Sequence, residues 1–238
     1  MTWMLHRFED DSALVAELAT AIADDLQSAI DQHGRAAMAV SGGSTPVGLF
    51  RALSVKDIAW SKVVVTLVDE RWVPENHADS NAALVRRHLL QNKAAKARFV
   101  GLKNDTSDPF LAVLDVEARL NMKVLPLDVV VLGMGEDGHT ASFFPAGEGL
   151  DEALNSVERV CCGVRPPSAP HDRMTLSLQT LLGARQLYLH IVGQKKLTVL
   201  EVAMAPGPVQ GLPVRAVLHQ SRVLLEIYYA ERAASAES

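Results

Sequence analysis

The chain has 238 residues, a formal net charge of -5 and 48% hydrophobic residues. Apolar residues are spread along its whole length, which excludes collagen-like, coiled-coil and disordered classes and leaves enough material for a core without disulfides or metals. A mildly acidic chain lacks the clustered positive charge that nucleic-acid or anionic-membrane surfaces need, so we expect neither partner.

The N-terminal segment and the cysteines indicate a cytoplasmic protein. Residues 1–11 include acids where a secretory signal has its apolar stretch, and no apolar run approaches the roughly 18 residues of a membrane span. The two cysteines, Cys161 and Cys162, are neighbours, a spacing that suits neither a bridge between them nor a redox or zinc motif. We expect unreactive thiols in a reducing compartment.

Helix-like and strand-like segments alternate along the chain. The first helix is expected over residues 12–33, where apolar residues recur every three or four positions before Gly34. The elements that follow, in chain order, are a strand at 36–40, a helix at 47–53, a strand at 63–68, a helix at 80–90, a strand at 98–102, a helix at 108–121, strands at 127–132 and 157–164, an ambiguous segment at 174–182, a strand at 185–192, helices at 194–204 and 214–220, and a strand at 222–228. This alternation predicts an α/β fold, a mostly parallel sheet with helices on both faces in a Rossmann-like three-layer architecture.

A single domain is expected over residues 1–238. The chain shows no internal repeat, low-complexity linker or shift of composition. Its Pro-rich stretch at 165–171 is short enough to be a loop within one domain.

Three polar segments directly follow the most strand-like runs, at residues 41–46, 69–74 and 133–140. In an open α/β sheet, ligands bind outside the carboxyl ends of the strands. We therefore expect the three segments to converge on one site.

The first segment suits a phosphate group. Gly42 and Gly43 allow backbone N–H groups to approach an anion, Ser44 and Thr45 add hydroxyl donors, and a helix starts immediately behind them. The segment follows neither the Walker nor the dinucleotide pattern. A tight turn with capping hydroxyls is the alternative interpretation.

The second segment offers an arginine beside two acids. Arg71 has a planar fork of donors suited to a phosphate or carboxylate. Asp69 or Glu70 could hold this arginine in place or take part in proton transfer. The alternative is a solvated loop with a local ion pair.

The third segment carries the most specific signal. His139 is suited to proton transfer near neutral pH, and Asp137 two residues earlier can orient it or stabilise its cation. The glycines of this segment permit a turn that substrate can approach. Phe143 and Phe144 are expected to pack the turn, with a wall of the pocket as the lesser possibility.

Two further cations are weaker candidates for anion binding. Arg173 precedes a strand-like run, where an exposed arginine is an equal possibility. Lys196 lies in the first turn of an expected helix, where a cation opposes the helix dipole and so hints at a bound anion, whereas Lys195 is expected to be solvated.

Two other classes of site find no support in the residue pattern. The chain has no Gly-x-Ser-x-Gly elbow and no His, Cys, Asp and Glu cluster with zinc spacing, and His171 beside Asp172 is too little to count. Metal-free acid–base chemistry on a small phosphorylated molecule is what the residues favour.

The three segments together resemble the 6-phosphogluconolactonases, within the group that includes glucosamine-6-phosphate isomerases. The matching motifs are Ser-Gly-Gly-Ser-Thr-Pro, Asp-Glu-Arg-Trp-Val-Pro and Gly-Met-Gly-Glu-Asp-Gly-His-Thr-Ala-Ser-Phe-Phe-Pro. The Pro-Pro loop before Arg173 and the Gly193-x-x-Lys196 element are similar to later motifs of that family, so the resemblance spans nearly the whole chain.

The resemblance implies hydrolysis of 6-phospho-D-glucono-1,5-lactone to 6-phosphogluconate, without a metal or organic cofactor. It implies that His139 is the base that activates water and that Asp137 is its partner. The first motif would hold the phosphate or the developing charge together with Arg71, Arg173 and Lys196.

Two rival functions remain. By family resemblance, the isomerases of the group have a second motif similar to Asp-Glu-Tyr and a third motif similar to Gly-His-Ile-Ala-Phe-Asn-Glu-Pro. This chain differs from both, because it has Arg71-Trp72 in the second motif and other residues at 140–145 in the third. A non-catalytic sugar-phosphate sensor is the other rival, but binding alone does not require the pair of Asp137 and His139.

Overall fold

A computed structural model describes residues 2–232 of the chain. Its centre is a seven-stranded sheet in the order β1-β10-β9-β6-β2-β3-β5, and all of its pairings are parallel. The strands are β1 (Trp3–Asp10), β2 (Ala36–Val40), β3 (Val63–Leu67), β5 (Arg98–Val100), β6 (Val129–Leu132), β9 (Gln186–Val192) and β10 (Leu225–Arg232). The expected parallel α/β architecture is confirmed.

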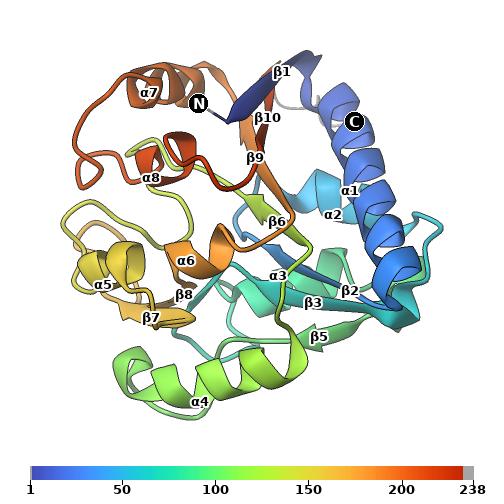
Figure 1. The fold of residues 1–238 in the computed structure, drawn as a ribbon, viewed down its shortest axis with the longest axis horizontal. Helices are drawn as coiled ribbons and strands as arrows, with labels where there is room; N and C mark the ends of the chain where they lie inside the picture. The colour runs from blue at the N-terminus through green and yellow to red at the C-terminus, as the bar shows by residue number, and fades with distance from the viewer. Residues whose placement is uncertain (1, 233–238) are drawn as a thin grey trace.

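Helices cover both faces of this sheet. In Figure 1, α1 and α2 lie on one side of it and α6, α7 and α8 on the other. The helices are α1 (Asp11–His33), α2 (Val47–Ser54), α3 (Asn81–His88), α4 (Pro109–Lys123), α5 (Leu150–Asn155), α6 (Leu178–Leu181), α7 (Gln194–Met204) and α8 (Arg215–Leu218). Among residues 2–232, no helix has the length and apolar character needed to cross a bilayer.

Helix α1 shows how local sequence sets an element's limits. Asp10 accepts a hydrogen bond from the Ala13 amide at 3.0 Å and so caps the first turn. Gly34 ends the helix in the left-handed region, at φ 76°. Between them, Leu18 and Ile22 belong to a stripe that is fully buried against the sheet. The expected helix is confirmed to within one residue.

A second sheet was not predicted from the sequence. It is antiparallel, in the order β4-β8-β7, and consists of β4 (Asp69–Arg71), β7 (Cys161–Val164) and β8 (Arg173–Leu176). The ambiguous segment 174–182 contains both a strand end and the short helix α6, and only the second half of the expected strand 157–164 is a strand. Strand β1 was also missed. Strands of three or four residues, such as β4, β7 and β8, carry too little periodicity to be recognised in a sequence, whereas the eight-residue β1 lacks a regular apolar pattern.

The two cysteines lie in β7 and are fully buried. Burial raises the pKa of both thiols, that of Cys162 to about 12. A thiol that remains protonated is a poor nucleophile and a poor metal ligand, in agreement with the expectation of unreactive thiols.

The order of the strands marks one position as suited to a ligand. Neighbouring strands β2 and β6 lead in opposite directions, because the chain continues from β2 to β3 and β5 but from β6 to β9 and β10. Such a divergence leaves a crevice at the carboxyl ends of the two strands.

Candidate active site

An open cleft of about 240 Å³ lies at this divergence, lined by residues that follow β2, β3, β6 and β9. The three polar segments do converge. The residues expected from the sequence that line the cleft are Gly42, Gly43, Ser44, Thr45, Arg71, His139 and Lys196. Asp137 and Arg173 do not line it.

The loop after β2 is tied to β6 and approaches α3 closely. The Ser41 hydroxyl accepts a hydrogen bond from the Gly133 amide at 3.2 Å. A Cβ on Gly42 would lie 1.8 Å from Asn81 Oδ1, so only glycine fits there, and Gly43 adopts the left-handed region at φ 93°. No side chain caps the N-terminus of α2, so no capping side chain competes with a bound anion for the amides of this turn. The geometry is that of a cradle for an anion.

The two acids before Arg71 have structural roles rather than holding its side chain. Glu70 is fully buried and accepts hydrogen bonds from the amides of Asn81 at 2.7 Å and Ala82 at 2.8 Å, which begin α3. Burial raises the Glu70 pKa, against the lowering effect of these bonds. Asp69 accepts from the Ser142 hydroxyl at 2.6 Å.

The guanidinium of Arg71 is anchored by the main chain. Its Nη1 donates to the Asp79 carbonyl oxygen at 2.6 Å, and neither Asp69 nor Glu70 forms an ion pair with it in the described residues. The expectation that one of these acids holds the Arg71 side chain is therefore wrong. The remaining donors of the fork are available to the cleft.

His139 and Asp137 form a hydrogen-bonded pair in the turn after β6. His139 Nδ1 lies 2.5 Å from Asp137 Oδ1, and the same carboxylate oxygen accepts from the His139 amide at 3.1 Å. Burial alone raises the Asp137 pKa, but the hydrogen bonds and charge of His139 outweigh it, so the pKa lies below its ordinary value. A carboxylate that stays ionised holds the proton on Nδ1 and leaves Nε2 as the acceptor.

An aromatic ring and a buried arginine support this pair from behind. Phe144 stacks on His139 with ring centroids 4.3 Å apart, and Arg173 lies over Phe144 at 5.8 Å. The Arg173 side chain is 6% exposed, burial lowers its pKa, and its Nε and Nη1 have no hydrogen-bond partner within the described part of the chain. The expected packing role of Phe144 is confirmed, and Arg173 is buried rather than exposed.

Lys196 is a second cation that lines the cleft, besides Arg71. It lies in the first turn of α7, and burial lowers its pKa while Glu136 acts in the opposite direction. Lys195, by contrast, is 82% exposed and makes a 3.6 Å ion pair with Glu136, as expected of a solvated side chain.

Sequence reasoning missed two polar residues of the cleft. Asn81 donates to the Asp69 carbonyl oxygen at 2.8 Å. His190, 3% exposed in β9, lies 3.1 Å from Asp11 Oδ1 through its Nε2. A histidine inside a run of buried strand residues was the signal that could have identified the second of these.

Comparisons with known proteins agree with this geometry. The family model described as glucosamine-6-phosphate isomerases/6-phosphogluconolactonase matches residues 9–225. A 6-phosphogluconolactonase of Pseudomonas aeruginosa is 48% identical over 202 residues, 84% of this chain and 85% of that protein. One of Rhizobium meliloti is 45% identical over 231 residues, covering 97% of this chain and 100% of its own length. The crystal structure of a 6-phosphogluconolactonase from Shewanella baltica superposes with a TM-score of 0.93 at 45% identity, covering 95% of this chain and 97% of that one. The chain thus belongs to the glucosamine-6-phosphate isomerase/6-phosphogluconolactonase family.

Proposed function

We propose that this protein hydrolyses 6-phospho-D-glucono-1,5-lactone to 6-phospho-D-gluconate, the second step of the oxidative pentose phosphate pathway, in the cytoplasm. Relatives named 6-phosphogluconolactonase at 45–48% identity support the substrate. The observation that carries the proposal is the pair of His139 and Asp137, of which His139 lines the same cleft as the anion cradle at Gly42 and Gly43. The cleft is lined by segments spread from residue 41 to residue 196, which supports a single domain over residues 1–238.

The cleft supplies two kinds of contact to such a substrate. The amides and hydroxyls from Gly42 to Thr45, with Arg71 and Lys196, hold either the phosphate or the charge that develops on the carbonyl oxygen. Binding the phosphate at one end of the sugar fixes the lactone carbonyl near His139. Arg173 is buried behind Phe144 and does not line the cleft, so it affects the substrate only through neighbouring side chains.

His139 performs both proton transfers of the reaction. Its Nε2 accepts a proton from water as the water oxygen bonds to the lactone carbonyl carbon, and Asp137 stabilises the imidazolium that forms. The tetrahedral intermediate then expels the ring oxygen, which takes the proton back from Nε2. A lactone is an activated ester, so this sequence requires neither a covalent intermediate nor a metal.

A direct assay tests this function. Purified protein should accelerate the loss of freshly generated 6-phosphogluconolactone and the accompanying release of acid, measured at constant pH against the spontaneous rate. A rate equal to the spontaneous one would contradict the proposal. Conversion of glucosamine 6-phosphate would instead favour the isomerase, and binding without turnover would favour the sensor.

Gly135→Ala is expected to lower kcat by roughly 10- to 100-fold. The new Cβ would lie 2.3 Å from two atoms of the His139 ring and 2.5 Å from Asp137 Oδ1, so the pair must move, and a displacement of about 1 Å costs this much in rate. Steady-state kinetics on the lactone measure the effect. Gly211→Ala is the control, because its Cβ would meet nothing closer than 3.7 Å. Equal rates for the two variants would show that the position of the pair is unimportant.

A further inference from the structure

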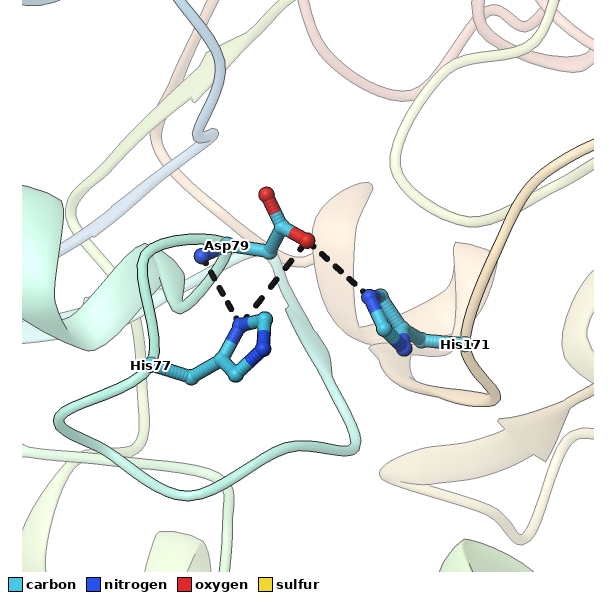
Figure 2. Close-up of side chains that lie close together, drawn as sticks. All are labelled: His77, Asp79 and His171. Atoms are coloured by element: carbon cyan, nitrogen blue, oxygen red, sulfur yellow. Dashed lines mark hydrogen bonds and ion pairs between the residues drawn. The ribbon is translucent and has the colours of Figure 1, made fainter.

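Two imidazoles and one carboxylate meet at the rim of the cleft, outside the site described above. His77 and Asp79 lie in the loop between β4 and α3, and His171 lies in the loop that leads into β8. Asp79 Oδ2 is 3.0 Å from His171 Nε2 and 3.8 Å from His77 Nδ1. Figure 2 shows this carboxylate oxygen between the two rings. The cluster joins loops 92 residues apart in the chain, so no local spacing revealed it.

We propose that His77, Asp79 and His171 form a binding site for a divalent transition-metal ion of the Zn²⁺ type, completed by water. One ligand atom from each residue lies within 4.8 Å of the other two. Tetrahedral coordination with bonds of about 2.0–2.2 Å places ligand atoms roughly 3.3 Å apart. Small side-chain rotations are therefore sufficient to close the three atoms around an ion.

The donor set selects the class of metal. Two imidazole nitrogens with one carboxylate oxygen suit zinc and its neighbours, whereas Mg²⁺ and Ca²⁺ prefer oxygen ligands alone. Three protein ligands leave a position open for water. The thiols, which would otherwise compete for a soft metal, are fully buried in β7.

The ring nitrogens of His77 and His171 are accessible to an ion from solvent. His77 Nδ1 accepts a hydrogen bond from the Asp79 amide at 3.1 Å, so it is unprotonated, and on binding it exchanges this hydrogen bond for a bond to the ion. The side chains of His77, Asp79 and His171 are 43%, 53% and 30% exposed, so an ion can reach them from solvent. On binding, His171 Nε2 exchanges its hydrogen bond to the carboxylate for a bond to the ion.

The backbone holds His171 in place for this role. Its φ is +68°, in the left-handed region that a residue other than glycine rarely adopts. Strain of this kind persists where the surrounding structure imposes it, and it concentrates at functional positions. In this conformation the imidazole lies 3.0 Å from Asp79 of the other loop.

An ion at this cluster would also affect the cleft. The Asp79 carbonyl oxygen accepts the hydrogen bond from Arg71 Nη1. Linking the Asp79 loop to the His171 loop therefore fixes the support of a cation that lines the cleft. The metal is a cross-link between loops and takes no part in the proton transfers at His139.

Calorimetric titration of the chelator-treated, full-length protein with Zn²⁺ tests the site without turnover, so its outcome is independent of the lactone assay. The wild type should show one saturable site of micromolar affinity. His171→Asn and His77→Asn should each weaken it by at least about tenfold, because each removes one of three ligands. Asparagine tolerates positive φ, so the first variant preserves the loop.

Two matched variants control for binding elsewhere. His6→Asn removes a histidine that also faces a carboxylate, Glu226 at 2.5 Å, and should leave the affinity unchanged. His139→Asn should do the same, and zinc should raise the melting temperature of both controls by more than that of His171→Asn. The proposal is overturned if the wild type binds no zinc below millimolar concentration, if His171→Asn binds as tightly as wild type, or if only His139→Asn loses binding.

Discussion

His139→Asn is expected to lower kcat for lactone hydrolysis by about 100- to 10,000-fold, the usual contribution of a positioned general base. Asparagine preserves a polar side chain of similar reach but cannot accept and return a proton. The affinity for 6-phosphogluconate should change little, because the Gly42 to Thr45 cradle and Lys196 do not depend on the imidazole. Steady-state kinetics corrected for spontaneous hydrolysis measure the first effect, and calorimetry measures the second.

His6→Asn is the matched control for this experiment. His6 also contacts a carboxylate, that of Glu226, but it lies in β1 at the edge of the sheet and does not line the cleft. The kcat of the His6→Asn variant should equal that of wild type. If His139→Asn retained activity within a factor of three of this control, another group would have to be the base.

Glu70→Ala is expected to lower the free energy of unfolding by about 3–5 kcal/mol, since it leaves several buried donors without an acceptor. The Glu70 carboxylate accepts from the amides of Arg71, Asn81 and Ala82 and from the Ser80 hydroxyl. Their loss affects both strand β4 and the start of α3. Urea unfolding followed by circular dichroism measures the change.

Two further variants make this result interpretable. Glu70→Gln preserves one oxygen acceptor and should fall between wild type and Glu70→Ala. Glu75→Ala removes an exposed carboxylate that pairs with Arg86 at 3.1 Å and should cost about 0–1 kcal/mol. A loss below about 1 kcal/mol for Glu70→Ala would mean that water replaces the carboxylate, and the structural role assigned to it would be wrong.

The parts of the fold that could be predicted are those with long, regular patterns. Helix α1 has a continuous apolar stripe between a capping aspartate and a terminating glycine, so its limits follow from local physics. Strands β2, β3 and β6 are buried on both faces and therefore read as unbroken apolar runs. Their order in the sheet brought the three polar segments together, as the rule for open α/β sheets predicts.

The parts that could not be predicted depend on tertiary contacts. Glu70 looks like a solvated acid in the sequence, but it is fully buried because the amides at the start of α3 satisfy it. Strand β1, at a sheet edge, mixes apolar and charged residues without regular alternation and so carries no strong pattern. Arg173 lies behind the cleft because β8 pairs with β4, a long-range contact without a local signal.

The pairing of strand β1 with β10 has a consequence for how the chain folds during synthesis on the ribosome. Residues 3–10 of β1 are synthesised long before their one pairing partner in the described sheet, β10 at residues 225–232. Before β10 is made, strands β2, β3, β6 and β9, which carry the cleft, can pair with one another, and of these four only β9 lacks a neighbour. Strand β1 must therefore remain unpaired until β10 has been synthesised, and closing so long a loop is slow. During that interval the nascent protein exposes an unpaired edge of β9, and this is the period in which chaperones would protect it from aggregation.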